Sequence, residues 1–139
     1  MTTRSLRISS LFALAFVALT ILRMTAQLAA QSADLGGATT YRLYCASCHG
    51  ASGKGDGPLA SSMKIAPANL TEIAKRNAGA FPADRVARII DGRSPSRSHG
   101  SEMPVWGDAF AASRIDSAPV GQRIQRLVAY LQSIQQPAP

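Results

Sequence analysis

The clearest hydrophobic pattern in the chain is a helical stripe near its C-terminus. Between positions 120 and 134, apolar residues recur at the spacings of three and four that mark one face of an α-helix. They are Val120, Ile124, Leu127, Val128, Leu131 and Ile134. Pro119 precedes this stripe and Pro137 follows it, and prolines are typical of both places. The pattern therefore predicts a closing helix over 120–134.

Shorter periodic segments predict further helices or helical turns. They lie at about 38–46, 59–63, 69–77 and 85–91. In the first of them Tyr41 and Tyr44 are three residues apart and share one side of the helix. Gly92 follows the last of them at the position where glycine commonly ends a helix. The Gly-rich segment 50–58 and the segment 93–104 are expected to be loops.

The chain contains no run of alternating polar and apolar residues that is long enough for a β-strand. Its 139 residues fit one compact domain, and no internal repeat or long linker indicates a second. We therefore expect an all-α fold with a single core.

The N-terminal residues have the pattern of a secretory signal. Arg4 and Arg7 precede fifteen residues, 8–22, of which only three are polar, and Arg23 ends the run. This arrangement of positive charge and apolar segment is typical of an export signal. The apolar run is short for a membrane span, which needs about 20 residues.

Small residues follow the apolar run, and Ala30-Gln31-Ser32 is the best approach to a cleavage site. The sequence therefore predicts a signal peptide over 1–32 and a mature domain over 33–139, located in the periplasm. The alternative is that the leader is retained as a short membrane anchor.

The net charge is less basic than it first appears. The whole chain carries +7, but three arginines lie in the leader and all acidic residues lie after it. The mature part keeps 12 basic and 8 acidic residues, a net charge of +4. Its longest basic block is Lys75-Arg76, which argues against a nucleic-acid-binding footprint. A mildly basic surface can still steer an acidic partner.

Both cysteines of the chain belong to one short motif, Cys45-Ala46-Ser47-Cys48-His49. Two cysteines three positions apart, followed at once by histidine, form the attachment site of a c-type haem. The thiols lie about one helical turn apart and can both bind one edge of the haem. The imidazole of His49 is then placed to be the proximal ligand of the iron.

The same residue types also occur in redox dithiols and zinc sites. A dithiol enzyme is expected within a βαβ pattern, which this sequence lacks. A zinc ion needs four ligands, and beside Cys45, Cys48 and His49 only His99 remains. Cys48 and His49 are adjacent and difficult to aim at one tetrahedral ion. The haem interpretation is therefore favoured.

The second axial ligand could come from any of three residues that follow the motif in the sequence, namely Met63, His99 and Met103. Met103 is favoured, because it stands 54 residues after His49, in a loop that Pro104 stiffens. Met63 falls in a short helical turn and is better placed to fill the core. His99 remains a minority alternative. A thioether ligand favours ferrous iron more than a second imidazole does, and so raises the reduction potential.

With these two motifs, residues 39–136 resemble a class I bacterial cytochrome c. The resemblance implies a small all-α fold of about four to five helices around one covalently bound haem c, with the first and last helices crossing. The contacts between these two helices would come from Gly36, Gly37, Tyr41, Tyr44, Leu127, Tyr130 and Leu131. The predicted export signal agrees with this resemblance, because haem attachment in this family takes place outside the cytoplasmic membrane.

The resemblance also assigns two residues to the surroundings of the haem. The neighbourhood of Pro67 would accept a hydrogen bond from the imidazole of His49 and fix its orientation. Trp106 would donate its indole N–H toward a haem propionate. The alternatives are an ordinary proline before a helix and an ordinary core tryptophan.

The function expected from the resemblance is one-electron transfer by a periplasmic monohaem cytochrome that cycles between Fe(III) and Fe(II), without catalysis. Its partners would be redox proteins, not nucleic acid, and it would meet the membrane only through its leader or its partners. The first alternative is a cytochrome c subunit of a membrane-associated dehydrogenase or oxidase complex. A further alternative is a gas-binding or sensor haem protein, in which Met103 leaves the iron open.

Overall fold

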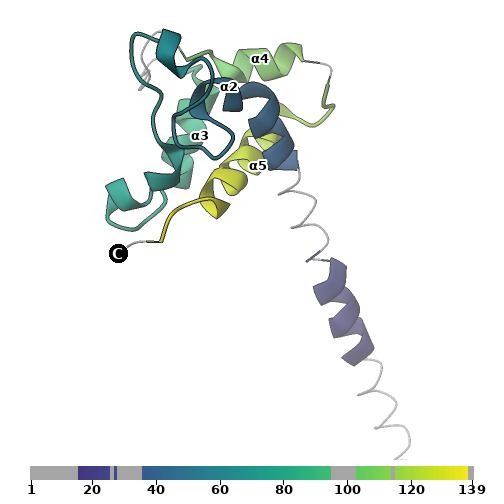
Figure 1. Cartoon of the computed structure of the whole chain (residues 1–139). Coiled ribbons are helices and arrows are strands. Elements are labelled where there is room, and N and C mark those ends of the chain that lie inside the picture. The colour runs from purple at the N-terminus through teal and green to yellow at the C-terminus, as the bar shows by residue number, and fades with distance from the viewer. Residues whose placement is uncertain (1–15, 26, 28–35, 95–102, 114, 138–139) are drawn as a thin grey trace, which may run out of the picture. The chain divides into compact units, whose positions relative to one another are not determined.

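The computed structural model describes residues 16–25, 27, 36–94, 103–113 and 115–137 (Figure 1). The chain divides into two units, Met1–Ser32 and Ala33–Pro139. In the first unit residues 16–25 are helical, and the apolar side chains from Phe16 to Met24 are exposed. Among the described residues, no helix is both long and apolar enough to cross a membrane. The signal peptide and its cleavage remain predictions.

The described part of the second unit contains helices and loops and no strand, which confirms the all-α prediction. Residues 36–44 are helical. They are followed by α2 (Ala46–His49), three short 3₁₀ helices η1 (Ala60–Ser62), η2 (Leu70–Glu72) and η3 (Lys75–Asn77), and then α3 (Ala83–Asp91), α4 (Trp106–Ala112) and α5 (Val120–Ser133). Figure 1 shows α3, α4 and α5 gathered with α2 in one bundle.

The helix predicted over 38–46 was wrong at both ends. The structure is helical from 36, the first residue described there, to 44, and it continues after a turn at Cys45 as α2. The backbone at Cys45 stays in the helical region, and the amide of His49 donates to the carbonyl of Cys45 over 2.9 Å. The chain leaves the helical path only at Gly50, whose φ of 81° favours glycine.

Helix α4 was missed by the prediction, which placed a loop over 93–104 and no helix between this loop and the closing helix. This helix has only seven residues, and its apolar anchors are Trp106 and Phe110, one turn apart. Two anchors make a weak periodic signal, and helices this short depend on packing for stability. Residues 95–102, including His99, lie outside the described part of the chain.

The first and last helices of the unit pack against each other, as the resemblance implied. A Cβ atom on Gly37 would overlap the carbonyl of Arg126 and lie 2.9 Å from the Cβ of Tyr130. The rings of Tyr41 and Tyr130 are 5.2 Å apart. Only glycine at position 37 therefore lets residues 36–44 approach α5 this closely.

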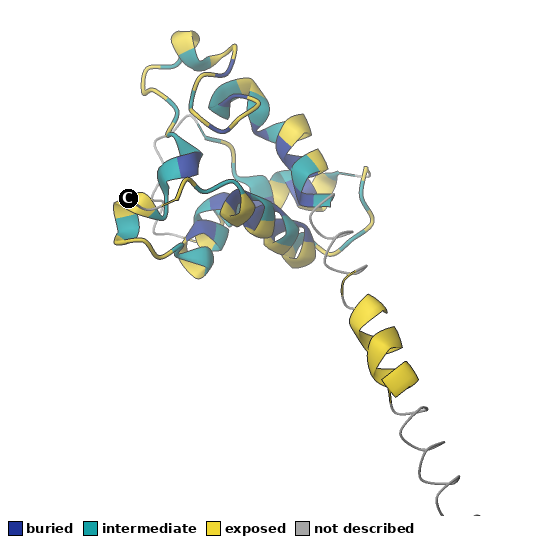
Figure 2. Cartoon of the chain, turned by 60° about the horizontal axis from the view of Figure 1, so that its bottom comes forward, coloured by how far each residue is buried: buried dark blue, intermediate teal, exposed yellow. Residues whose placement is uncertain are grey.

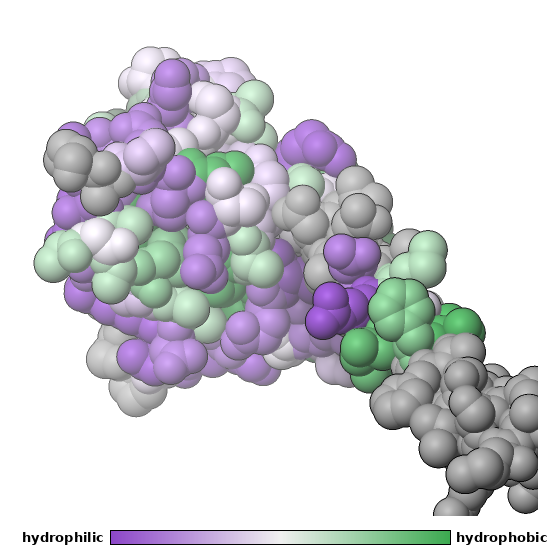
Figure 3. Space-filling view, turned by 90° about the horizontal axis from the view of Figure 1, so that it is seen from below, coloured by the Kyte–Doolittle hydropathy of each residue, from purple (hydrophilic) through white to green (hydrophobic). Residues whose placement is uncertain are grey.

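The core lies where α5 meets the other helices. The apolar stripe predicted for α5 faces this core. Ile124, Leu127, Val128 and Leu131 are buried, whereas Val120 and Ile134 are half-buried and pack against the core. Helix α3 adds Val86 and Ile90, α4 adds Phe110, and residues 36–45 add Tyr41 and Cys45. In Figure 2, buried residues lie on the packed helices, and exposed residues lie in loops and on the outer sides of the helices. On the face shown in Figure 3, hydrophobic residues gather in a patch that hydrophilic residues border.

Candidate haem site

A cavity of about 550 Å³ lies among α2, α3, α5 and the loop before η2. Its volume is in the range of about 300–1,000 Å³ that holds small-molecule ligands and cofactors. Most of its wall is apolar, with Ile65, Leu70, Ile73, Val86, Ile89, Ile90, Leu127 and Leu131 among the lining residues. The haem motif does not predict that these side chains line a cavity. Those on α3 and α5, however, belong to the apolar helical stripes that the sequence shows.

The cavity brings together residues from distant parts of the sequence. Every residue assigned to the haem or its surroundings from the sequence lines it, namely Cys45, Cys48, His49, Pro67, Met103 and Trp106. The alternative ligand Met63 lines it as well, while His99 lies outside the described residues. The fold thus closes the long stretch between motif and methionine around one space.

The two cysteines differ in their surroundings. Cys45 is buried at the turn before α2, whereas Cys48 is half-buried in that helix. Burial and, to a smaller extent, the nearby Cys48 raise the pKa of the Cys45 thiol to about 12. Redox dithiols instead need a lowered pKa, because the thiolate is their reactive form. This environment disfavours the dithiol alternative. In the described residues, no group of three or more His, Cys, Asp or Glu side chains is placed to hold a metal ion.

His49 ends α2 and is oriented by a backbone carbonyl. Its Nδ1 lies 3.0 Å from the carbonyl oxygen of Ala68. With the proton on Nδ1, the imidazole donates this hydrogen bond and keeps the lone pair of Nε2 for a metal. The partner is therefore the residue after Pro67, which itself stands in the cavity wall.

The Gly-rich loop 50–57 holds the two sides of this hydrogen bond together. The amide of Gly55 donates to the carbonyl of His49 over 2.8 Å, and the amide of Leu70 donates to the carbonyl of Gly53 over 2.7 Å. Both glycines have positive φ, and a Cβ on Gly55 would overlap the carbonyl of Pro67. The glycines therefore allow the loop to link the end of α2 to the segment that carries Ala68.

Tyr41 supports the end of α2 through a buried hydrogen bond. Its side chain is fully buried, and its hydroxyl donates to the carbonyl of Gly50 over 2.6 Å. Burial, followed by the nearby Cys45, raises the pKa of this phenol above its ordinary value. The neutral hydroxyl is therefore kept, and with it a bond that fixes the exit from α2.

The opposite wall is aromatic. Met103 and Pro104 lead into α4, where Trp106 stacks on Phe110 with ring centroids 5.8 Å apart. Tyr44 meets both rings edge-on, at 5.6 Å and 5.3 Å. Trp106 thus belongs both to the cavity wall and to this aromatic cluster of Tyr44, Trp106 and Phe110.

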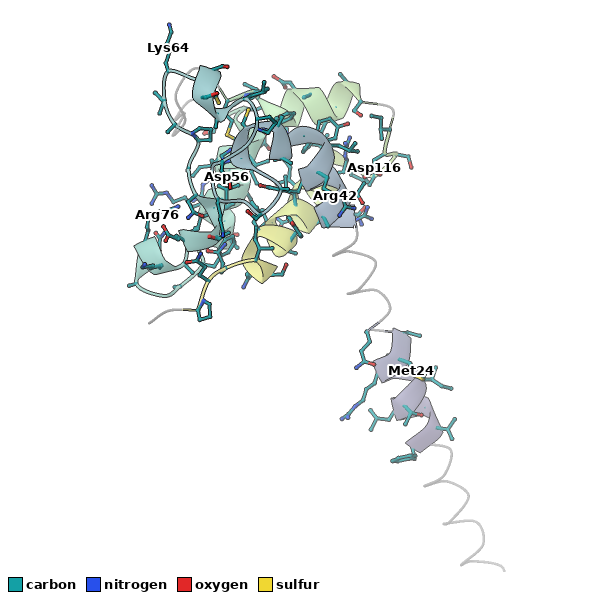
Figure 4. The ribbon with its side chains drawn as sticks, in the orientation of Figure 1. Met24, Arg42, Asp56, Lys64, Arg76 and Asp116 are labelled. Atoms are coloured by element: carbon teal, nitrogen blue, oxygen red, sulfur yellow. The ribbon has the colours of Figure 1, made fainter. Side chains whose placement is uncertain are left out.

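The cavity wall also contains polar groups. Arg76, Asn77 and Arg85 line it, and sequence reasoning missed them because single basic residues carry no motif. Arg76 donates through Nη2 to the carbonyl of Asn69 over 2.6 Å and faces Glu72; Figure 4 labels Arg76. An apolar space with two thiols, an oriented imidazole and cationic groups that can balance carboxylates fits a haem with its two propionates.

Comparison with known proteins supports this site. The family model described as Cytochrome C oxidase, cbb3-type, subunit III matches residues 32–131. A search of curated proteins and a search of solved structures each found no match. Since the family model spans most of the sequence, the chain belongs to this cytochrome c family, binds covalently attached haem c and takes part in electron transfer.

Proposed function

We propose that the chain is a periplasmic monohaem cytochrome that carries one electron at a time between redox proteins. In this proposal Cys45 and Cys48 would form the thioethers to the haem, and His49 and Met103 would bind its iron. The supporting observation is the single cavity, whose wall includes all four side chains. The bound haem supplies the one-electron Fe(III)/Fe(II) couple.

The residues around the cavity fit a carrier. The Ala68 carbonyl holds the imidazole of His49 in one orientation, so little reorganisation accompanies a change of oxidation state. Met103, as a ligand, would keep substrates and gases from the iron. The apolar walls from α3 and α5 keep water away and favour the less charged, ferrous state.

Carbon monoxide separates this carrier from a gas-binding or sensor protein. The gas is added to the dithionite-reduced holoprotein at neutral pH, and the Soret band is followed. We expect no rapid change, because Met103 occupies the site. Fast, stoichiometric binding would contradict the carrier proposal and favour the gas-binding alternative.

The leader pattern and the outward-facing location typical of cytochrome c domains support a periplasmic location. An intact mass of the protein recovered from the periplasmic fraction tests it. The expected mass is that of residues 33–139 plus one haem. A mass that includes the whole leader would favour the anchored form, and a second haem would contradict the monohaem proposal.

The second candidate is a cytochrome subunit of a membrane-bound oxidase complex, which the printed description of the family model favours. Membranes solubilised in mild detergent can be separated on a native gel and stained for covalent haem. A free carrier gives stain in the soluble periplasmic fraction. Stain that migrates with oxidase activity in the membrane fraction would establish the subunit instead.

A further inference from the structure

An arginine is among the most deeply buried side chains of the described structure. Arg123 of α5 is 1% exposed, comparable to Tyr41 and Leu127. Removing a guanidinium from water is costly unless its charge and its N–H groups find partners. The contacts that Arg123 makes therefore indicate which structural role offsets the cost of burying it.

Most of the partners of Arg123 belong to the aromatic cluster. Its Nη1 donates to the carbonyl of Phe110 over 3.1 Å, and its guanidinium carbon lies 4.4 Å from the centroid of the Phe110 ring. The Tyr44 ring is 5.9 Å away. Phe110 lies in the last turn of α4, where carbonyls lack a partner within the helix. Arg123 thus binds both the backbone and the ring of one residue.

The ion pair of Arg123 with Asp116 is weak, because no hydrogen bond joins the two side chains. The Nε of Arg123 lies 3.5 Å from Oδ2 of Asp116 and forms no hydrogen bond. Asp116 is partly exposed and is shared with Arg126, whose Nη1 lies 3.8 Å from the same oxygen; Figure 4 labels Asp116. An ordinary ion pair with Asp116 therefore does not account for the placement of Arg123.

We propose that Arg123 is a positioning residue for the distal wall of the haem cavity. It fixes α4 on α5 through Phe110, and the stack of Phe110 on Trp106 passes this constraint to the cavity wall. Because Met103 and Pro104 lead directly into α4, the same contact holds the segment that bears the distal ligand. This last step rests on the proposed function, whereas the effect on Trp106 does not.

The side-chain chemistry explains why an arginine is needed. A guanidinium is planar, so it can lie over the Phe110 ring and donate to the Phe110 carbonyl at once. A lysine ammonium is a compact point charge and can keep only one of these interactions well. Methionine fills a similar volume without either interaction, and replacing buried charges by apolar groups is often tolerated in folding.

Trp106 provides a direct reporter, because it is the only tryptophan of the chain. In the holoprotein its fluorescence is quenched by energy transfer to the haem, so the yield and lifetime report how firmly α4 is held against the cavity. The proposed variants are Arg123→Met and Arg123→Lys, with Arg126→Met as the matched control. Arg126 shares Asp116 and the same helix, but its side chain lies beside Gly36.

We expect Arg123→Met to raise the fluorescence yield of Trp106 in the holoprotein at least about two-fold and to add a long lifetime, while far-ultraviolet circular dichroism stays native. Arg123→Lys should give a smaller rise, and Arg126→Met none. If Met103 is the ligand, Arg123→Met also weakens the long-wavelength ferric band that reports sulfur–iron bonding.

An unchanged Trp106 signal in Arg123→Met would overturn the proposal, as would an equal change in Arg126→Met. Should Arg123→Met fail to fold, Arg123→Lys decides, because an unchanged signal in that folded variant also overturns it. Absence of the sulfur–iron band in the wild type would contradict only the assignment of Met103 as a ligand. The fluorescence comparison would still decide the role of Arg123.

Discussion

The two walls of the haem cavity are built in different ways. On the proximal side, Cys45, Cys48 and His49 lie within five consecutive residues, and the backbone of α2 alone sets their spacing. On the other side, Met103 lies in the segment that leads into α4, and α4 is held by contacts from α5. One wall is therefore specified locally, and the other depends on packing between distant parts of the chain. Variants should affect the two walls to different extents.

The largest effect is expected from the proximal wall. Replacing Cys45 and Cys48 together by alanine removes both thioether bonds, so all haem should become extractable by acidified organic solvent. The matched control is Ser47→Ala, an exposed position between them, which should keep the haem attached. Covalent haem in the double variant would contradict the attachment site.

A smaller change is expected from the distal wall. Met103→Ala should leave the haem attached, open the sixth position to carbon monoxide and lower the reduction potential, because a thioether favours ferrous iron. Met63→Ala is the control, since Met63 also lines the cavity. Carbon monoxide binding in the Met63 variant, but not in the Met103 variant, would exchange the two assignments.

Helix α5 packs against residues 36–44 and against α4. It carries none of the proposed haem ligands, so its packing can be tested separately from them. Gly37→Ala should destabilise the fold by about 1–3 kcal/mol, because the new methyl group overlaps the carbonyl of Arg126. Gly121→Ala is the matched control, since nothing lies within 4 Å of its added Cβ. This exposed helical position should instead gain about 0.5–1 kcal/mol. Denaturant unfolding followed by circular dichroism measures both, and equal effects would contradict the close helix contact.

The smallest effect is expected at the end of α3. The hydrogen bond from Arg93 lowers the pKa of the Asp91 carboxyl below its ordinary value, and the pair lies beside Gly107 of α4. A lowered pKa means that the carboxylate stabilises the fold above its unfolded-state pKa and loses this effect as pH falls through the folded value. Asp91→Asn should slightly lower the thermal midpoint at neutral pH and leave it unchanged in acid. A deficit that grows in acid would contradict this sign.

The same contrast explains how much could be predicted from the sequence. The closing helix was predictable because a long apolar stripe carries it. The fixed motif likewise named Cys45, Cys48 and His49, which line the cavity, while their bonds to the haem remain predictions. Met103 was found as a methionine in a loop at a suitable distance. Its assignment as the ligand remains a prediction, although it does line the cavity.

The support of the distal wall could not be predicted in this way. Helix α4 has only two apolar anchors, and the bond from Arg123 to the Phe110 carbonyl joins residues that are thirteen positions apart in the sequence. One signal was present, because position 123 lies four residues before Leu127 and eight before Leu131, on the buried face of α5. A charged residue on an apolar helix face indicates a specific partner, but only the packed structure identifies Phe110.

The central claim is that the two walls supply His49 and Met103 to one haem iron, and the methionine side is the part that local sequence does not secure. Proton NMR of the ferrous holoprotein with methyl-labelled methionine tests it most directly. We predict one methionine methyl signal shifted far upfield by the haem ring current, absent in Met103→Ala and retained in Met63→Ala. A spectrum in which no methionine methyl signal is shifted upfield would contradict the account.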